Sequence, residues 1–295
     1  MIDYITKQVI ENELTSFSFN KHVHDRNDIL NFMENIHLNT LLEELSISYM
    51  EIGDNDFKII VNALKNNESL KILNMAHIGI TKISVKYLAE MLRHNKTLKI
   101  LYINYNDIGD DGAKMLMDGL MDNNTLEQLY VVDNNIGDNG AIEIANFLQH
   151  NNTLKKLNIW KNNIGDVGMS AIANALCVNT TLKTFDISYN KIVNENPISH
   201  FLAVDNNLEM LDISHNNIDH IGEIIRALKY NHRLKCLNVD FNKFKIPNEK
   251  ELYETFNINH TLGLVSGFGN ILDHLLTLEQ RQLRANRSRM KPAKY

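Results

Sequence analysis

The sequence has few residues of the kinds that mark several protein classes. Three prolines in 295 residues leave no room for a proline-rich linker. Two cysteines, Cys177 and Cys236, make no disulfide framework, so we expect two reduced thiols. The net charge is -6, so the chain lacks the basic surface that binds phosphate backbones. We therefore expect no nucleic-acid partner.

Long hydrophobic runs and catalytic motifs are also missing. No stretch is apolar and long enough to be a transmembrane segment, and the start, MIDYITKQVIENEL, has no apolar core of a Sec-type signal peptide. The 12 histidines form no H-E-x-x-H motif, and there is no C-x-x-C, no glycine-rich phosphate loop and no G-x-S-x-G. We therefore expect no enzyme activity, no cofactor and no metal site.

What the sequence has instead is an internal repeat. Leucines recur in steps of 28 residues, interrupted by two steps of 26 near the C-terminal end. They are Leu14, Leu42, Leu70, Leu98, Leu126, Leu154, Leu182, Leu208, Leu234 and Leu262. A nearly constant period of this length predicts a stack of similar structural units.

Each unit begins with the pattern L-x-x-L-x-I/V-x-x-N-x-I. One example is Leu98, Leu101, Ile103, Asn106 and Ile108. The fourth and sixth places are apolar and alternate with polar residues, which is typical of a strand with one buried face. In the G-D-x-G-A segment that follows, Gly109 suits a turn and Asp110 suits a helix N-cap, and the next residues have helical spacing. Stacked units then form a parallel sheet inside a curve and a row of helices outside.

These motifs resemble leucine-rich repeats, specifically the 28-residue class that is similar to ribonuclease inhibitor and the repeat regions of NOD-like receptors. The resemblance implies an α/β solenoid, a horseshoe of about nine to ten repeats with a parallel concave sheet and convex helices. We expect a single domain over 1–295, with an N-terminal cap helix at 1–13, repeats at 14–270 and a C-terminal helix and basic tail at 271–295. The tail is either solvated or docks on an acidic partner or membrane surface.

The resemblance also implies a ladder of asparagines at the ninth place, which bind backbone groups that have left the sheet. They are Asn106, Asn134, Asn162, Asn190, Asn216 and Asn242. His22, Met50 and Ile78 stand there in the first three units, so we expect a less regular N-terminal end. Asn-x-Ser/Thr recurs at the unit boundaries, where we expect a structural role rather than glycosylation. These positions are Asn67, Asn95, Asn123, Asn151 and Asn179.

Two units are two residues shorter than the others. They begin at Leu182 and Leu208, and Pro197 interrupts the helical pattern of the first. We expect shortened or irregular helices there, with a local change in curvature.

The alternation predicts which side chains reach the concave face. Leu157 and Ile159 point inward, so Lys156, Asn158 and the single tryptophan, Trp160, point the other way. The same register adds candidate partner-binding residues in other units. They are Tyr102, Tyr105, Tyr130, Asp133, Lys161, Asp186, Tyr189, Asp212 and Asp240. The middle of this face is thus aromatic and its C-terminal end acidic.

Two interpretations of this face compete with protein binding. Aromatic residues are favoured in strands for structural reasons, although tyrosine and tryptophan also dominate interface hot spots. Asp186 and Asp212 lie on neighbouring strands about 5 Å apart, a spacing at which two carboxylates bind a cation or act as acid and base. No third polar group or pocket is implied beside them, so we favour protein binding.

Three further resemblances concern function. A free-standing repeat chain resembles the repeat effectors that bacteria inject into host cells, which implies a cytoplasmic location or the cytosol of a host. Regulators of the RanGAP type share this repeat class, but their functional residues have no match here. The segments NHTLGLVSGF and RQLRAN resemble the end of tropomodulins, which cap actin filaments, while a tropomodulin-like N-terminal region is lacking. We expect a monomeric, non-enzymatic module that binds a protein partner on its concave face.

Overall fold

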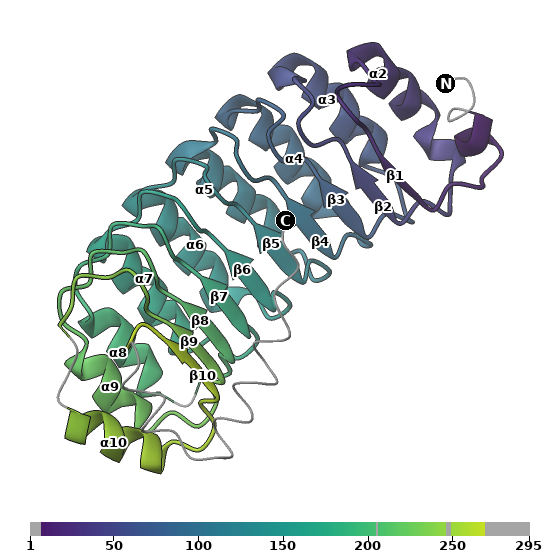
Figure 1. Ribbon diagram of the computed structural model, residues 1–295. Helices are drawn as coiled ribbons and strands as arrows, with labels where there is room; N and C mark the ends of the chain where they lie inside the picture. The colour runs from purple at the N-terminus through teal and green to yellow at the C-terminus, as the bar shows by residue number, and fades with distance from the viewer. Residues whose placement is uncertain (1–6, 205, 246–248, 269–295) are drawn as a thin grey trace.

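The computed structural model describes residues 7–204, 206–245 and 249–268. Its strands form one parallel ten-stranded sheet whose spatial order is the chain order. The strands are β1 (Ser16–Ser18), β2 (Glu44–Ser46), β3 (Ile72–Asn74), β4 (Ile100–Tyr102), β5 (Gln128–Tyr130), β6 (Lys156–Asn158), β7 (Thr184–Asp186), β8 (Met210–Asp212), β9 (Cys236–Asn238) and β10 (Leu264–Ser266). Figure 1 shows an elongated molecule with the strands along one side and the helices along the other.

One helix follows most of the strands. These helices are α2 (Arg26–Asn35), the 3-10 helix η1 (Ile36–Leu38), α3 (Gly53–Leu64), α4 (Lys82–His94), α5 (Gly109–Leu120), α6 (Asp138–His150), α7 (Asp166–Leu176), α8 (Asn196–Leu202), α9 (Gly222–Leu228) and α10 (Glu249–Ile258). The fold is therefore an α/β leucine-rich-repeat solenoid, as the period predicts.

The strand register follows the leucine period in every unit. Each strand covers the third to fifth places after its opening leucine, and neighbouring strands pair place for place, as Leu129 does with Leu101 and with Leu157. Because every unit has the same number of residues up to its strand, equivalent side chains lie side by side across the sheet. The inward positions predicted from the alternation, such as Leu157 and Ile159, are confirmed because these side chains are buried.

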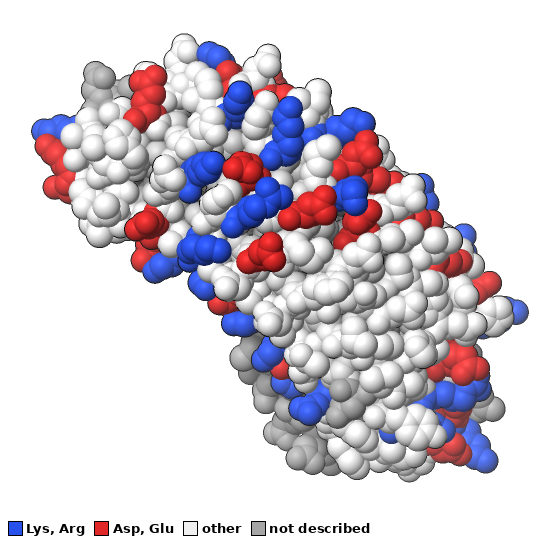
Figure 2. All heavy atoms as spheres, turned by 180° about the vertical axis from the view of Figure 1, so that it is seen from behind, with Lys and Arg blue, Asp and Glu red and all other residues white. Residues whose placement is uncertain are grey.

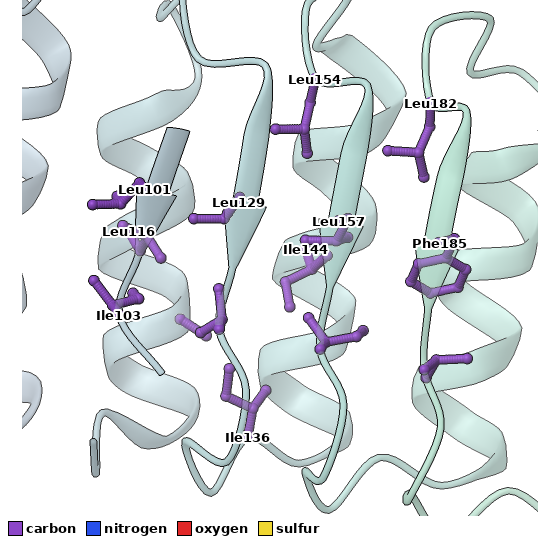
Figure 3. Packing of buried hydrophobic residues seen from close by; sticks show 14 of the residues in the cluster. Leu101, Ile103, Leu116, Leu129, Ile136, Ile144, Leu154, Leu157, Leu182 and Phe185 are labelled. Carbon is purple, nitrogen blue, oxygen red and sulfur yellow. The ribbon is translucent and has the colours of Figure 1, made fainter. Parts of the chain in front are cut away.

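The core fills the space between the sheet and the helices. Leu101 of β4 and Ile103, the residue just after this strand, are fully buried, as is Leu116 of α5. Figure 3 shows the fourth-place residues Leu101, Leu129, Leu157 and Phe185 at one level across four units, with the helices behind them. Each unit buries only one face against its own helix and the next unit, so the units stabilise one another along the stack.

The asparagine ladder is present. Asn162 donates from Nδ2 to the carbonyl oxygens of Val131 and Ile159, both at 3.0 Å, and its Oδ1 accepts from the backbone amides of Asn134 and Ile136 at 3.1 and 3.0 Å. It therefore joins two units at the point where the backbone leaves the sheet.

The second and third ladder positions hold apolar residues. Met50 and Ile78 are buried there, and the amides of Ile52 and Gly53 donate directly to the Ile78 carbonyl oxygen at 3.1 and 3.0 Å. This end thus differs from the regular ladder, as expected. Fewer hydrogen bonds join its units at the turn.

The boundary asparagines have the predicted structural role. Asn123 is buried, and its Oδ1 accepts from the amides of Thr125 and Leu126 at 3.0 and 2.9 Å. Its Nδ2 donates to the Leu92 carbonyl oxygen of the preceding unit at 2.7 Å. The side chain therefore closes one helix and positions the next strand.

The prediction for Asp110 is wrong, although that for Gly109 is confirmed. Gly109 has φ +61°, in the left-handed region that glycine tolerates, but α5 begins at this glycine and its N-cap is Ile108. The Asp110 carboxylate instead accepts from the Gly137 amide of the next unit at 2.6 Å. Asp138 likewise accepts from Gly165 at 2.7 Å and Gly168 at 2.9 Å. These aspartates cap the helix of the following unit, because its N-cap glycine has no side chain to do so.

The two short units have short helices, as predicted. Helices α8 and α9 contain 7 residues each, whereas α5, α6 and α7 contain 12, 13 and 11. Pro197 lies in the first turn of α8, where its missing amide costs no helical hydrogen bond.

The two predicted ends differ in how far the structure describes them. Of the segment 1–13 that is predicted as a cap helix, residues 7–10 are helical and Val9 is buried. The predicted C-terminal helix and basic tail at 271–295 lie outside the described residues. Over the described parts of the chain, the helices are all too short or too polar to cross a membrane.

Candidate partner-binding surface

The third, fifth and seventh places of the units form the concave face, and the eighth places follow its edge. Tyr102 and Tyr130 stack there with ring centroids 4.4 Å apart and planes 21° from parallel. Lys156 lies over the other side of the Tyr130 ring, with Nζ 4.9 Å from its centroid. The Tyr130 hydroxyl donates to Gln128 Oε1 at 2.9 Å.

These contacts correct the expectation that Tyr130 is displayed. It is on the predicted face but only 2% exposed, because Tyr102 and Lys156 cover it. Tyr102, Lys156 and Trp160 remain partly exposed. Tyr130 therefore supports the rings and cation around it and offers little surface of its own to a partner.

The acidic run occupies the next two strands. Asp186 and Asp212 are paired in register on β7 and β8. Asp186 accepts from the Ser188 hydroxyl at 2.6 Å and from Asn158 Nδ2 at 3.1 Å, and Asp212 accepts from the Ser214 hydroxyl at 2.6 Å and from Asn238 Nδ2 at 2.8 Å. Each carboxylate is thus held by the serine two residues further along its own unit and by an asparagine on the adjacent strand that does not carry the other aspartate.

The environment of Asp186 disfavours its charged form. Burial, and then the negative charge of Asp212, raise the pKa of Asp186 from 3.8 to about 6, while hydrogen bonds from Ser188 and the charge of Lys156 act in the opposite direction. Asp186 therefore titrates much closer to neutral pH than an ordinary aspartate.

The eighth places share an unusual backbone conformation. In eight successive units a residue other than glycine stands there with φ between 50° and 62°. These residues are Tyr49, His77, Tyr105, Asp133, Lys161, Tyr189, His215 and Phe241. A side chain in the left-handed region costs about 1–2 kcal/mol relative to the right-handed one, so each of these positions is strained, and most of them hold an aromatic ring.

The rings at the C-terminal end of this row form a continuous stack. His215 lies between Tyr189 and Phe241, with ring centroids 3.8 and 4.1 Å away and planes 18° from parallel in both cases. Trp160 packs its edge against Tyr189 at 5.3 Å. Phe241 is 74% exposed and Tyr189 43%, so the stack presents apolar surface to solvent.

The candidate residues thus divide into groups. Lys161 pairs with Asp133 at 2.6 Å, between the tyrosine stack and the C-terminal rings. Tyr105 lies toward the N-terminal end, in a depression that it lines with Tyr49, His77 and Asp133. Asp240 is partly exposed on the unit of β9. The structure places all of the predicted residues on the concave face or its edge, but in separate clusters.

The third places of the concave face carry apolar side chains that the set predicted from the sequence does not include. Partly or fully exposed apolar side chains stand there at Ile72, Ile100 and Met210. The same alternation that identified Trp160 continues one step upstream and would have found them. The left-handed backbone of the eighth places has no such signal, because glycine and asparagine, which mark it elsewhere, are replaced by aromatic residues.

Charged side chains are unevenly distributed on the face of the molecule that is hidden in Figure 1. Figure 2, which views the molecule from behind, shows lysine, arginine, aspartate and glutamate interspersed over the N-terminal half and a broad area without them over the C-terminal half. Two valines at the helices are exposed, Val167 on α7 by 62% and Val178 just after it by 63%. Across the residues that the structure covers, no group of three or more His, Cys, Asp and Glu is placed to hold a metal ion.

Family models of repeats agree with this architecture. Models described as leucine-rich repeats match residues 94–117, 122–145, 150–173 and 178–195, and a second such model matches 207–230. A search of curated proteins finds no match. Among solved structures, the chain is similar to leiomodin-1 actin-binding site 2, with 22% identity, a TM-score of 0.41, and coverage of 61% of this chain and 89% of that one. The matches to the family models show that the protein contains leucine-rich repeats.

Proposed function

We propose that the protein is a non-enzymatic module that binds a partner protein in its concavity. The observation that carries the proposal is the set of partly exposed rings held in fixed positions on that face. Tyr102 rests on Tyr130, and Trp160 rests on Tyr189. A ring that is already immobilised loses little conformational entropy when a partner covers it, which favours affinity.

The polar groups beside the rings favour specificity. Lys156 and Asn158 follow each other along the concave side of β6, and both are partly exposed. Asn158 Oδ1 accepts from the Trp160 amide at 2.9 Å, while its Nδ2 donates to Asp186. These side chains are oriented before binding, so they select a partner with matching donors and acceptors.

A comparison of two single-residue variants tests the proposal. Wild type, Trp160→Ala and Val167→Ala are used to capture proteins from a eukaryotic lysate; Val167 is the matched control because it is exposed on helix α7. We expect the control to retain a specific partner that Trp160→Ala loses. Calorimetry with that partner is expected to show a cost of about 2 kcal/mol or more, a factor of about thirty, for Trp160→Ala. Equal affinity of wild type and Trp160→Ala would contradict the concave-face proposal.

A further inference from the structure

The C-terminal end of the concave face combines acids and exposed rings. We call it the acidic–aromatic surface and define it by Asp186, Asp212, Asp240, Tyr189, His215 and Phe241. Its carboxylates lie on the units of β7, β8 and β9, and its rings form the stack along the edge of the same three units.

This combination matches the chemistry of an arginine side chain. A guanidinium ion stacks on aromatic faces and forms paired hydrogen bonds with carboxylates, so a segment with several arginines can use both parts of the surface. Lys161 pairs with Asp133, and Lys156 lies over Tyr130 while its charge also acts on Asp186, so the three carboxylates share the charge of one lysine. The surface therefore has an excess of negative charge.

The backbone beneath the rings supports a binding role. Tyr189, His215 and Phe241 have φ of 54°, 50° and 56°, where glycine or asparagine would cost less. Phe241 is 74% exposed, so it contributes little core burial that would offset this strain. Because the left-handed turn recurs in eight units, the strain belongs to the repeat, and the exposed rings that stand on it serve a purpose other than core packing.

The chain itself carries a segment with the complementary charge. Residues 281–295 contain six basic side chains and no acidic one. The basic residues are Arg281, Arg284, Arg287, Arg289, Lys291 and Lys294. The last described residue, Phe268, follows β10, which is the immediate neighbour of β9.

The connection is long enough to reach the surface. The 12 residues from 269 to 280 can span up to about 40 Å when extended, and β8 is two strand spacings from β10, about 10 Å. Attachment to the same chain gives such a segment an effective concentration in the millimolar range. A weak intrinsic affinity would therefore suffice to keep it bound.

We propose that the basic segment 281–294 docks on the acidic–aromatic surface of its own chain. Arginine side chains stack on the exposed rings and pair with Asp212 and Asp240. The segment then covers the C-terminal half of the concave face and competes with any ligand there. The docking does not depend on the proposed function, whereas the competition with a partner protein rests on it.

The single tryptophan provides a reporter for this docking. Trp160 contacts Tyr189 and is partly exposed, so a segment on the stack should change its emission and shield it from a neutral quencher. The full-length wild type is compared with a full-length variant that has Arg281→Gln, Arg284→Gln, Arg287→Gln and Arg289→Gln. We expect weaker quenching in wild type at low salt, and equal quenching at about 1 M NaCl, where charges are screened beyond about 3 Å.

A second measurement uses a synthetic peptide of residues 279–295 added to the four-glutamine variant. We expect a saturable change in Trp160 emission, and about tenfold weaker binding after Asp212→Asn or Phe241→Ala, the loss expected for one charge-assisted or cation–π contact. Asp118→Asn, an exposed acid on α5, is the matched control and should leave peptide binding unchanged.

Three outcomes would overturn the docking. The first is identical quenching of wild type and the four-glutamine variant at every salt concentration. The second is peptide binding whose affinity is unchanged by Asp212→Asn and by Phe241→Ala. The third is a Trp160 signal that depends on protein concentration, which would place the segment on a second copy. Both proposals are supported if Trp160→Ala fails to capture the partner and the peptide binds to the four-glutamine variant. Docking without any effect of Trp160→Ala on partner capture contradicts the proposed function alone.

Discussion

Leu157 and Trp160 are close in the sequence, yet they contribute to stability in different ways. Leu157 is 1% exposed in the core, whereas Trp160 is partly exposed on the concave face. We expect Leu157→Ala to lower the free energy of unfolding by about 2–5 kcal/mol, because it leaves a cavity. Trp160→Ala removes one edge contact and is expected to cost clearly less. Urea unfolding of both variants checks this, and a larger loss for Trp160→Ala would mean that the inside and outside assignments are reversed.

Asp186 is expected to make stability depend on pH. Its folded-state pKa of about 6 lies above the ordinary value of 3.8, so between these values the folded protein holds more protons than the unfolded chain. This contribution to the free energy of unfolding is therefore greatest at acidic pH and is lost as the pH rises through about 6. The side chain of Asp186→Asn cannot ionise, so the stability of this variant should rise relative to that of wild type as the pH increases from about 4 to about 6.

The pKa itself can be followed by carboxyl carbon NMR. Because the Asp212 charge is the second cause of the raised value, Asp212→Asn should lower the pKa of Asp186. Asp240→Asn is the control and should leave it in place. An Asp186 resonance that titrates at an ordinary aspartate pKa in wild type would contradict the burial of this carboxyl.

At the scale of the element, each strand exit combines a strained backbone conformation with a side chain on the edge of the concave face. Each exit from β2 to β9 turns through one left-handed residue, and this geometry recurs whichever side chain stands there. The turn is therefore imposed by the repeat, which leaves the side chain free to serve another purpose.

Phe241 allows the backbone strain to be measured separately from the ring. Phe241→Gly and Phe241→Ala both remove the ring, but only glycine relieves the left-handed φ of 56°. We expect the glycine variant to be more stable than the alanine variant by about 1 kcal/mol in chemical unfolding. At Ser170, an exposed position within α7, the order should be reversed because alanine favours helix over glycine. The same order at both sites would mean that the exit is not strained.

At the scale of the whole molecule, the period of the sequence was enough to predict the fold. The opening leucine of each unit determines which residues pair, so Leu157 and Trp160 could be assigned to opposite faces without coordinates. Contacts between units were harder to predict. Tyr130 is buried by side chains of its neighbours β4 and β6, and Asp110 caps a helix one unit away. The burial of Tyr130 and the capping by Asp110 depend on the residues at equivalent places in adjacent units. The pattern of a single unit gives no information about those residues.

Stability is also expected to vary along the stack, because each unit contacts only its neighbours. In the middle, Asn162 joins two units through backbone bonds in both directions, whereas Met50 and Ile78 make no such side-chain hydrogen bonds. The N-terminal units should therefore open first, and the amides of β2 should exchange with solvent deuterium faster than those of β6. Asn162→Leu, which imitates the apolar N-terminal arrangement, should raise exchange in β5 and β6 while leaving β2 unchanged. Uniform protection from β2 to β6 in wild type would show that the ladder does not set the stability between units.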